Sequence, residues 1–239
     1  MRNLCVVLAM VGTVAAPAVA ADVWAGTMFA SYGDLNPAIS ATDALQGKLG
    51  VIDAGGFHFA LPNDPVKFTD GILGTNLDCV LADYGQPTLT VRYEDTALNW
   101  TPTAISGIYS FAGNDDKNGR VFQNLQVQWK DVHGNWNAAF GGANLTAPTS
   151  GYYVQNGGQW QGSIVALTDD TGGALFGGAQ VHGLKFTYWA VDNTQDWFVP
   201  PTDTGAVVAT ILKEIDVVAI PEPATLLLLG LGCLILRRR

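Results

Sequence analysis

Short apolar segments alternate with glycine-rich turns along most of this chain, and this pattern limits the folds that it can adopt. The turns recur too often for long helices, and the segments between them are rich in the β-branched and aromatic residues that favour strands. Charged residues make up only 14% of the chain, fewer than a helical bundle needs. We therefore expect an all-β fold, an antiparallel jelly-roll β-sandwich that spans residues 22–219 as one domain. The main turn signals are Gly113-Asn114-Asp115-Asp116, Gly141-Gly142, Gly157-Gly158, Gly172-Gly173 and Gly177-Gly178.

Residues 125–130 show the strand pattern most clearly. Leu125, Val127 and Trp129 alternate with polar residues, and this period of two indicates a strand with one buried face. Residues 132–135 then predict a turn that contains His133, and residues 136–140 predict the returning strand. Trp129 is interpreted as a core residue. The other predicted strands run over residues 88–93, 105–111, 163–167, 184–191 and 207–218.

The amino terminus predicts export. Arg2 precedes a short apolar stretch, and the small residues that end at Ala18-Val19-Ala20 form the pattern that signal peptidase cuts. The apolar stretch is too short for an uncleaved membrane anchor. We therefore expect a signal peptide over residues 1–21, cut after Ala20 or one residue later, with Ala18 and Ala20 as the recognised positions.

The carboxyl terminus has three parts in a fixed order: Pro221-Glu222-Pro223, a Leu-rich run over 224–236, and Arg237-Arg238-Arg239. As a helix the 13-residue run reaches only about 20 Å, against a hydrocarbon core of about 30 Å. The terminal arginines would hold that end in the cytoplasm. The run is therefore suited to a temporary anchor, and a simple membrane anchor is the alternative.

This tail resembles the PEP-CTERM sorting signal, and the resemblance covers Pro221 to Arg239. It implies a sorting tail at residues 220–239 that a membrane protease, the exosortase, cuts near Pro-Glu-Pro. Bacteria with this system make extracellular polysaccharide. The resemblance thus implies a protein of the cell envelope, cell surface or extracellular matrix that the tail anchors to the membrane before processing.

Residues 68–218 resemble the discoidin-like, galactose-binding-like jelly rolls. The similar segments are 108–111, 120–127, 134–136, 184–188 and 213–217, together with Thr69-Asp70-Gly71. In calcium-bearing members, an early Asp-Gly loop meets a Glu of the last strand. The resemblance therefore implies calcium as a cofactor, held by Asp70 and Glu214. The alternative is a surface Asp70 and a Glu214 that pairs with its surroundings.

Acidic residues outnumber basic ones, 21 to 12, for a net charge of −9. Loss of Arg2 and of the three terminal arginines makes the exported form more acidic, with a net charge of −13. This charge argues against nucleic acid as a partner. Most of the acidic residues are Asp, which is typical of solvated loops, and calcium sites are the second interpretation. Cys5 and Cys233 lie in the two ends, so Cys79 stands alone in the domain and no internal disulfide can form there.

No catalytic residues are predicted. His58, His133 and His182 lack the spacing of zinc ligands, and no Gly-x-Ser-x-Gly motif occurs. The adjacent pairs Asp115-Asp116 and Asp169-Asp170 are interpreted as solvated turn residues rather than as the facing carboxyls of a glycosidase.

Three tryptophans in polar or proline-rich surroundings, Trp100, Trp160 and Trp197, are candidates for stacking on a sugar. We therefore expect a non-catalytic binding or structural domain associated with carbohydrate or exopolysaccharide. A secreted polysaccharide-active enzyme, similar to a glycoside hydrolase, is the alternative. The partners expected are signal peptidase, the exosortase and extracellular polysaccharide.

Overall fold

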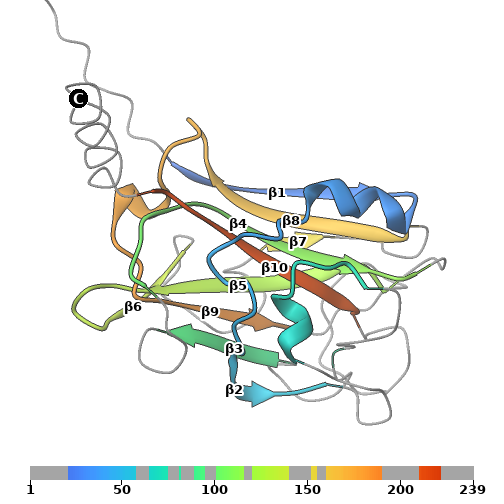
Figure 1. The fold of residues 1–239 in the computed structure, drawn as a ribbon, viewed down its shortest axis with the longest axis horizontal. Helices are drawn as coiled ribbons and strands as arrows, with labels where there is room; N and C mark the ends of the chain where they lie inside the picture. Colours follow the sequence, from blue (N-terminus) through green and yellow to red (C-terminus); the bar gives the residue numbers. More distant parts are fainter. Residues whose placement is uncertain are drawn as a thin grey trace, which may run out of the picture.

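The computed structural model describes residues 21–57, 65–74, 81, 89–94, 101–115, 120–139, 152–154, 160–189 and 210–221. Strands dominate this part of the chain, and its helices are short 3-10 turns: η1 (Tyr32–Ala38), η2 (Pro65–Phe68) and η4 (Leu175–Gly178). None of the described helices is long and apolar enough to cross a membrane. The strands form two layers, which Figure 1 shows one above the other.

The first layer contains four strands in the order β1-β8-β4-β10. Their bounds are β1 (Asp22–Phe29), β8 (Gly162–Asp169), β4 (Ile105–Gly113) and β10 (Leu212–Ala219). Every neighbouring pair is antiparallel. The register between β1 and β8 runs without a shift along all eight residues of β1.

The second layer has the order β2-β3-β9-β5-β6, and β7 also pairs with β5. Its strands are β2 (Val51–Gly55), β3 (Leu89–Glu94), β9 (Gly183–Tyr188), β5 (Gln123–Lys130), β6 (Trp136–Ala138) and β7 (Tyr152–Val154). The chain passes from β4 to β5, from β8 to β9 and from β9 to β10, so it changes sheet repeatedly. This connectivity is that of a jelly roll, and the predicted all-β sandwich is confirmed.

The core lies between the two sheets. Leu125 and Val127 of β5 face Ile108 of β4 and Ile215 of β10 across it, as the predicted alternation requires. Trp129 is partly buried at the margin of this core, and its ring stacks on Phe176 with centroids 4.9 Å apart and planes at 7°. A second apolar cluster covers the other face of the first sheet, where Tyr32 and Leu35 of η1 contact Phe111 and Ile164.

A buried polar network also joins the two sheets. Gln123 of β5 accepts a hydrogen bond from the hydroxyl of Ser110 on β4 (2.6 Å) and donates to the hydroxyl of Ser163 on β8 (2.9 Å). Ser110 also contacts the hydroxyl of Tyr188 on β9 at 2.8 Å, and Ser163 donates to the carbonyl of Val121. Because each hydroxyl has a partner, the network carries little desolvation cost and fixes how the sheets align.

The predicted strands agree with the observed ones to within a few residues where the structure describes them. The predicted turn at 132–135 is present between β5 and β6, with Gly134 at φ 83°. Two predictions differ. The predicted strand at 184–191 ends at Tyr188, and the predicted strand at 207–218 is described from residue 210 and begins at Leu212. The signal peptide and the apolar run 224–236 lie outside the described residues.

Candidate functional site

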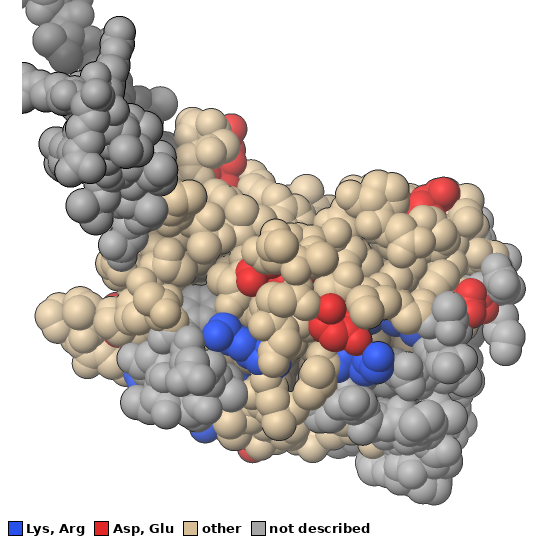
Figure 2. Space-filling model, in the orientation of Figure 1, with Lys and Arg blue, Asp and Glu red and all other residues tan. Residues whose placement is uncertain are grey.

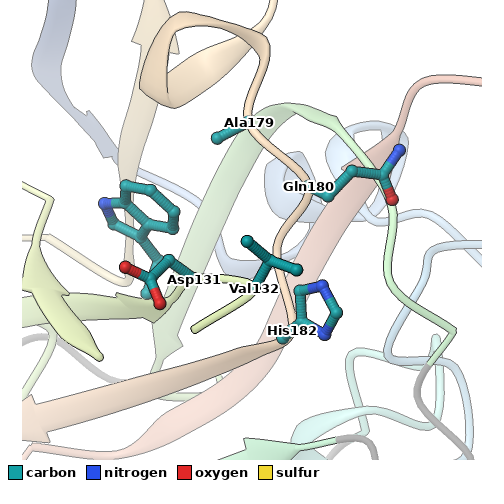
Figure 3. A pocket seen from close by; sticks show the side chains of 6 residues that line it. Asp131, Val132, Ala179, Gln180 and His182 are labelled. Atoms are coloured by element: carbon teal, nitrogen blue, oxygen red, sulfur yellow. The ribbon is translucent and has the colours of Figure 1, made fainter. Parts of the chain in front are cut away.

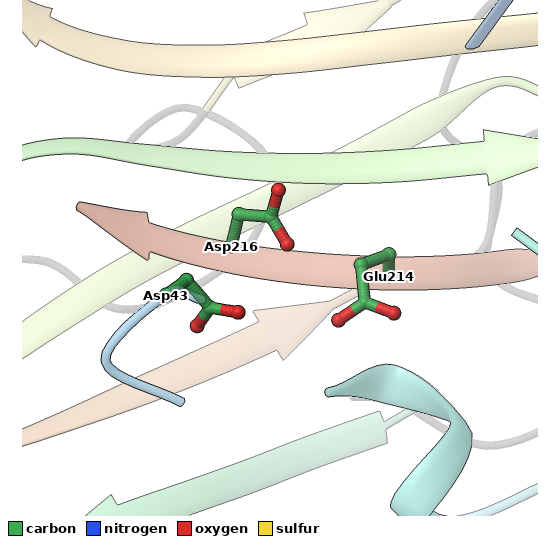
Figure 4. A group of neighbouring side chains, drawn as sticks. All are labelled: Asp43, Glu214 and Asp216. Atoms are coloured by element: carbon green, nitrogen blue, oxygen red, sulfur yellow. The ribbon is translucent and has the colours of Figure 1, made fainter. Parts of the chain in front are cut away.

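Three carboxyl groups meet on the outer face of the first sheet. Asp43, Glu214 and Asp216 each offer a carboxylate oxygen, and these oxygens all lie within 4.8 Å of one another. Figure 4 shows Glu214 and Asp216 on β10 and Asp43 on the loop that faces this strand. We refer to these three residues as the acidic cluster.

A bulge in β10 places the cluster there. The pairing of β10 with β4 shifts register between Leu212 and Glu214. Because side chains alternate along a strand, one extra residue moves every later side chain to the opposite face. Leu212, Ile215 and Val217 therefore all reach the core, while Glu214 and Asp216 point away from it.

Backbone groups hold one oxygen of each carboxyl group. Asp216 accepts a hydrogen bond from the N–H of Ser40 (2.6 Å), Asp43 from the N–H of Leu45 (2.6 Å), and Glu214 from the N–H of Gly71 (3.2 Å). The other oxygen of each group is buried and has no hydrogen-bond partner among the described residues. None of the three carboxylates forms a salt bridge within the described part of the chain.

Burial makes negative charge costly in this place. Burial is the main cause that raises the pKa of Glu214 to about 9. The charges of Asp216, Asp70 and Asp43 act in the same direction, and the hydrogen bond from the N–H of Gly71 opposes the shift. Burial likewise raises the pKa of Asp216 to about 6 and raises the pKa of Asp43. Glu214 therefore keeps its proton at neutral pH unless a cation replaces it.

The donor set fits a hard divalent cation. Calcium prefers six to eight oxygen ligands and accepts carboxylates together with neutral oxygens. The amide Oε1 of Gln46 is also buried and has no described hydrogen-bond partner. The Gln46 side chain lies against Gly71, whose N–H binds Glu214. Among the described residues no sulfur or imidazole belongs to the cluster, which disfavours zinc.

The resemblance implied that Asp70, in an early Asp-Gly loop, and Glu214 hold calcium. In the structure this loop reaches Glu214 through Gly71, whose N–H donates to the carboxylate. The carboxylate of Asp70 lies outside the acidic cluster, because it accepts from the N–H of Ile72 and pairs with Lys67 at 3.0 Å. Asp43 and Asp216 were missed. Asp216 follows Glu214 by two residues on one strand, and this spacing places both side chains on the same face, so it could have indicated Asp216. Asp43 is 171 residues from Glu214 in the sequence, and only the fold brings the two close.

A pocket of about 360 Å³ opens at the end of the sandwich where β5 ends and β9 begins. Trp129 forms one wall, Val132 of the β5–β6 turn lies at the rim, and Gln180 and His182 come from the segment before β9. Figure 3 shows these side chains around a shared space, together with Asp131 and Ala179. Val132 is 66% exposed, an unusual state for valine.

Hydrogen bonds hold both sides of this pocket. The carboxylate of Asp131 accepts from the N–H groups of His133 (2.8 Å) and Asn135 (2.9 Å) across the turn, and chiefly the bond from Asn135 lowers the pKa of Asp131 to about 2. On the other side, the N–H of His182 donates to the carbonyl of Lys130 at 2.8 Å. The pocket is therefore built into the fold rather than formed by a loose loop.

The tryptophans singled out from the sequence lie elsewhere. Trp160 is partly buried just before β8, which begins where β4 ends, so it lies at the opposite end of the sandwich from the pocket. Trp100 and Trp197 lie outside the described residues. The interpretation of Trp129 as core was incomplete, because its ring also lines the pocket. Asp169 is not solvated as expected: it is only 5% exposed and accepts from the N–H groups of Thr171 and Gly173.

Charged side chains are few among the described residues of one face of the molecule (Figure 2). Figure 2 shows one face on which most atoms belong to uncharged residues, with acidic and basic side chains close together near the middle. This face offers no broad basic region.

Comparison with known proteins identifies the tail. Residues 219–239 match the PEP-CTERM protein-sorting motif. No curated protein matches the sequence. One similar solved structure is CpGH89CBM32-4 from Clostridium perfringens, with a TM-score of 0.41 and 12% identity, covering 74% of this chain and 99% of that chain. The same domain in complex with GlcNAc-α-1,4-galactose has a TM-score of 0.39 and 12% identity, covering 74% of this chain and 93% of that chain. CpGH89CBM32-6 from the same organism has a TM-score of 0.34 and 10% identity, covering 75% of this chain and 100% of that chain. The chain thus carries a PEP-CTERM sorting motif at its carboxyl terminus, as the sequence of the tail predicts.

Proposed function

We propose that this chain is an exported protein of the cell envelope or extracellular matrix, and that its sandwich is a non-catalytic domain that binds carbohydrate. The sorting motif at residues 219–239 supports delivery to the exosortase and processing at the surface. The ligand we propose is extracellular polysaccharide. The single structural observation that supports binding is the pocket lined by Trp129, Gln180 and His182.

The chemistry of this pocket suits a sugar ring. One face of a pyranose is covered by C–H groups and packs on an aromatic ring, while its hydroxyl groups need hydrogen-bond partners. The indole of Trp129 supplies the apolar surface, and the amide of Gln180 and the imidazole of His182 supply donors and acceptors beside it. Mostly apolar walls with a few fixed polar groups are typical of small-ligand sites.

Calcium is the cofactor we propose for the acidic cluster. Its charge would replace the proton on Glu214 and balance the negative charge of the cluster. It would tie β10 to the loop of Asp43 and, through Glu214, to the loop of Gly71. The role is structural, because the cluster and the pocket are formed by different residues.

The test is binding of the exported protein to a glycan array and to exopolysaccharide from the producing cells. Gln180→Ala and Val132→Asp should each weaken binding about tenfold, which corresponds to about 1.4 kcal/mol. Trp160→Ala, at the opposite end of the sandwich, is the matched control and should leave binding unchanged.

Equal binding by the pocket variants and the wild type would contradict the proposed site. Loss of binding with Trp160→Ala alone would transfer the site to the other end of the sandwich. Release of shorter sugars from the polymer would instead support the alternative, a secreted polysaccharide-active enzyme.

A further inference from the structure

One residue beside the pocket has a backbone conformation that its residue type rarely adopts. Phe176 in η4 has φ 57° and ψ 32°, in the left-handed region that residues with a Cβ normally avoid. The next two residues, Gly177 and Gly178, are left-handed as well, at φ 65° and 79°. A strained residue of this kind persists only where its surroundings hold it in place, and such residues cluster at binding sites.

The phenyl ring of Phe176 makes a specific contact with the wall of the pocket. It stacks on the indole of Trp129, with ring centroids 4.9 Å apart and planes at 7°, an arrangement that aromatic pairs favour when the rings are offset. Phe176 therefore covers one face of the indole. Trp129 lines the pocket and Phe176 is not among the described residues that line it. A ligand can consequently reach only the other face of the indole or its edge.

Three contacts hold the turn that carries Phe176. Leu175, the preceding residue, is fully buried in the core between the sheets. The N–H of Phe176 donates to the carboxylate of Asp22 on β1, at 3.3 and 3.2 Å to its two oxygens. The carbonyl of Phe176 accepts from the N–H of Ala179 at 3.3 Å. Because the strained backbone is tied to the core, to β1 and to its own turn, the phenyl ring has a defined position.

The same turn also determines where a second wall of the pocket lies. After the two left-handed glycines the chain continues into Ala179, Gln180 and His182, which line the pocket and follow one continuous segment in Figure 3. One short stretch of chain thus supplies the polar wall and, through the ring of Phe176, supports the aromatic wall formed by Trp129. The geometry of both walls depends on this turn.

We propose that Phe176 is a positioning residue for the carbohydrate pocket. It holds the indole of Trp129 in the orientation that a sugar ring meets, and it acts through this contact without touching the ligand itself. This role rests on the proposed function of the pocket as a carbohydrate site. It adds to that function the residue that prepares the aromatic surface before the ligand arrives.

The free energy of ligand binding explains why a supporting ring is useful here. Trp129 is only partly buried at the margin of the core, and without support its side chain could occupy other rotamers. A ligand that must first immobilise such a side chain loses part of its binding free energy. The stack with Phe176 fixes the indole beforehand. Glycine would adopt the left-handed turn without strain, but it has no ring to place against Trp129.

Fluorine NMR of the exported protein, labelled with 5-fluorotryptophan, tests the positioning without a ligand. The resonance of Trp129 is assigned by its loss in Trp129→Phe, and in the wild type it should be a single sharp line. Phe176→Leu keeps an apolar side chain but removes the ring, so it should shift this line and broaden or split it. Phe176→Tyr keeps the ring and should leave the line sharp. An unchanged Trp129 line in Phe176→Leu would overturn the proposal.

Phe57 provides the matched control. It is also partly buried against the core and contacts another ring, that of Phe68, with centroids 5.3 Å apart. It follows β2 at the end of the second sheet where β9 ends, whereas the pocket lies where β9 begins. Phe57→Leu should therefore lower the melting temperature, as loss of packing does, and leave the Trp129 line unchanged. The same change of this line in Phe57→Leu and Phe176→Leu would indicate general loosening of the fold and contradict a specific role.

Binding of exopolysaccharide from the producing cells to the same variants tests the consequence for recognition. Phe176→Leu should weaken binding about tenfold, whereas Phe176→Tyr and Phe57→Leu should bind as the wild type does. Equal binding by the wild type and Phe176→Leu would refute the role in recognition. If the wild type binds no polymer, the proposed function of the pocket fails, and the fluorine spectra still decide whether Phe176 positions Trp129.

Discussion

The carboxyl group of Glu214 is buried where negative charge is costly, so its protonation state depends on the charged groups beside it. Without a metal ion, burial raises its pKa to about 9 and that of Asp216 to about 6. Both values exceed the pKa values of the unfolded chain. Between the unfolded and the folded pKa of each group, the folded state therefore binds more protons than the unfolded state. By linkage, that difference lowers the stability of the fold as pH rises.

The first prediction is that chelated protein melts at a lower temperature at pH 8 than at pH 5. Glu214 contributes full stability below its unfolded pKa of 4.5 and loses it as pH rises toward about 9, and Asp216 acts in the same direction up to about 6. Calorimetry with a chelator across this range measures the effect. A chelated protein whose melting temperature does not fall between pH 5 and 8 would contradict the burial of this carboxyl group.

The second prediction is that calcium raises the melting temperature at pH 8. A ligand at about a hundredfold excess over its dissociation constant stabilises the folded state by about 2.7 kcal/mol. For a chain of this size that is a rise of about 5–10 °C. Extracellular modules bind calcium at about 10⁻⁴–10⁻³ M, so millimolar calcium is required.

Two variants separate a specific site from a general effect of charge. Glu214→Gln should abolish the calcium-dependent rise, whereas Asp34→Asn, at an exposed residue of η1, should preserve it. The same rise in wild type and Glu214→Gln would remove calcium from the acidic cluster.

The acidic cluster also shows what can be learned from residues alone. Glu214 and its early partner loop were predictable, because a short motif and a final strand can be recognised locally. That Asp70 lies outside the acidic cluster was not predictable, because its salt bridge with Lys67 depends on the turn of η2. Nor was the inclusion of Asp43, which a loop far away in the sequence carries to β10.

At the scale of elements, η1 covers the first sheet only because two glycines face each other beneath it. Gly113 of β4 pairs with Gly162 of β8. A Cβ at Gly162 would come within 2.8 Å of the Leu35 side chain, and one at Gly113 would come within 2.5 Å of Tyr32. The absence of side chains on the sheet lets the helix pack close.

Gly162→Ala should therefore destabilise the fold by about 1–3 kcal/mol, the usual cost of overpacking. Gly56→Ala is the matched control, because a Cβ there meets nothing within 4 Å, and its effect should stay within about 0.5 kcal/mol. Denaturant unfolding measures both. Equal stability of the two variants would show that η1 shifts freely over the sheet.

The polar network between the sheets leads to another prediction. Ser110→Ala removes the hydroxyl that binds Gln123 and Tyr188 and leaves their buried polar groups without this partner, so it should cost about 1–3 kcal/mol. Ser106→Ala on the same strand lies at a more exposed position and should cost little. Similar losses in both variants would mean that the network contributes nothing specific.

The strands were more predictable than the side chains that join them. Alternation at Leu125, Val127 and Trp129 follows directly from the period of a strand, so residues 125–129 were correctly assigned. The bulge after Leu212 was hidden, because a sequence with Lys213, Glu214 and Asp216 between apolar residues fits either face. The pocket was missed because Trp129 satisfies the alternation of a core residue whether or not its ring also meets solvent.

At the scale of the whole molecule, the sandwich and the sorting tail meet at a well-defined boundary. The last described backbone bonds of the domain involve Ile220, whose N–H donates to the carbonyl of Ala104 at 2.7 Å and whose carbonyl accepts from Thr103. Pro221 follows and is exposed. Thr103 also pairs with Val181, so the tail leaves the domain beside the segment that lines the pocket.

The final prediction is that processing near Pro-Glu-Pro leaves the fold intact. A chain that ends after Pro223 should melt within about 1 °C of the full exported chain, because no described backbone bond lies beyond Ile220. A chain that ends after Asp216 should unfold at a markedly lower temperature, since it loses the carbonyl of Val217 that binds Ala44.

Mass spectrometry of protein from the cell surface should find a mature form that begins at Ala21 or Asp22 and lacks the Arg cluster. A mature protein that still ends in Arg239 would show that the motif at 219–239 acts as a permanent anchor instead.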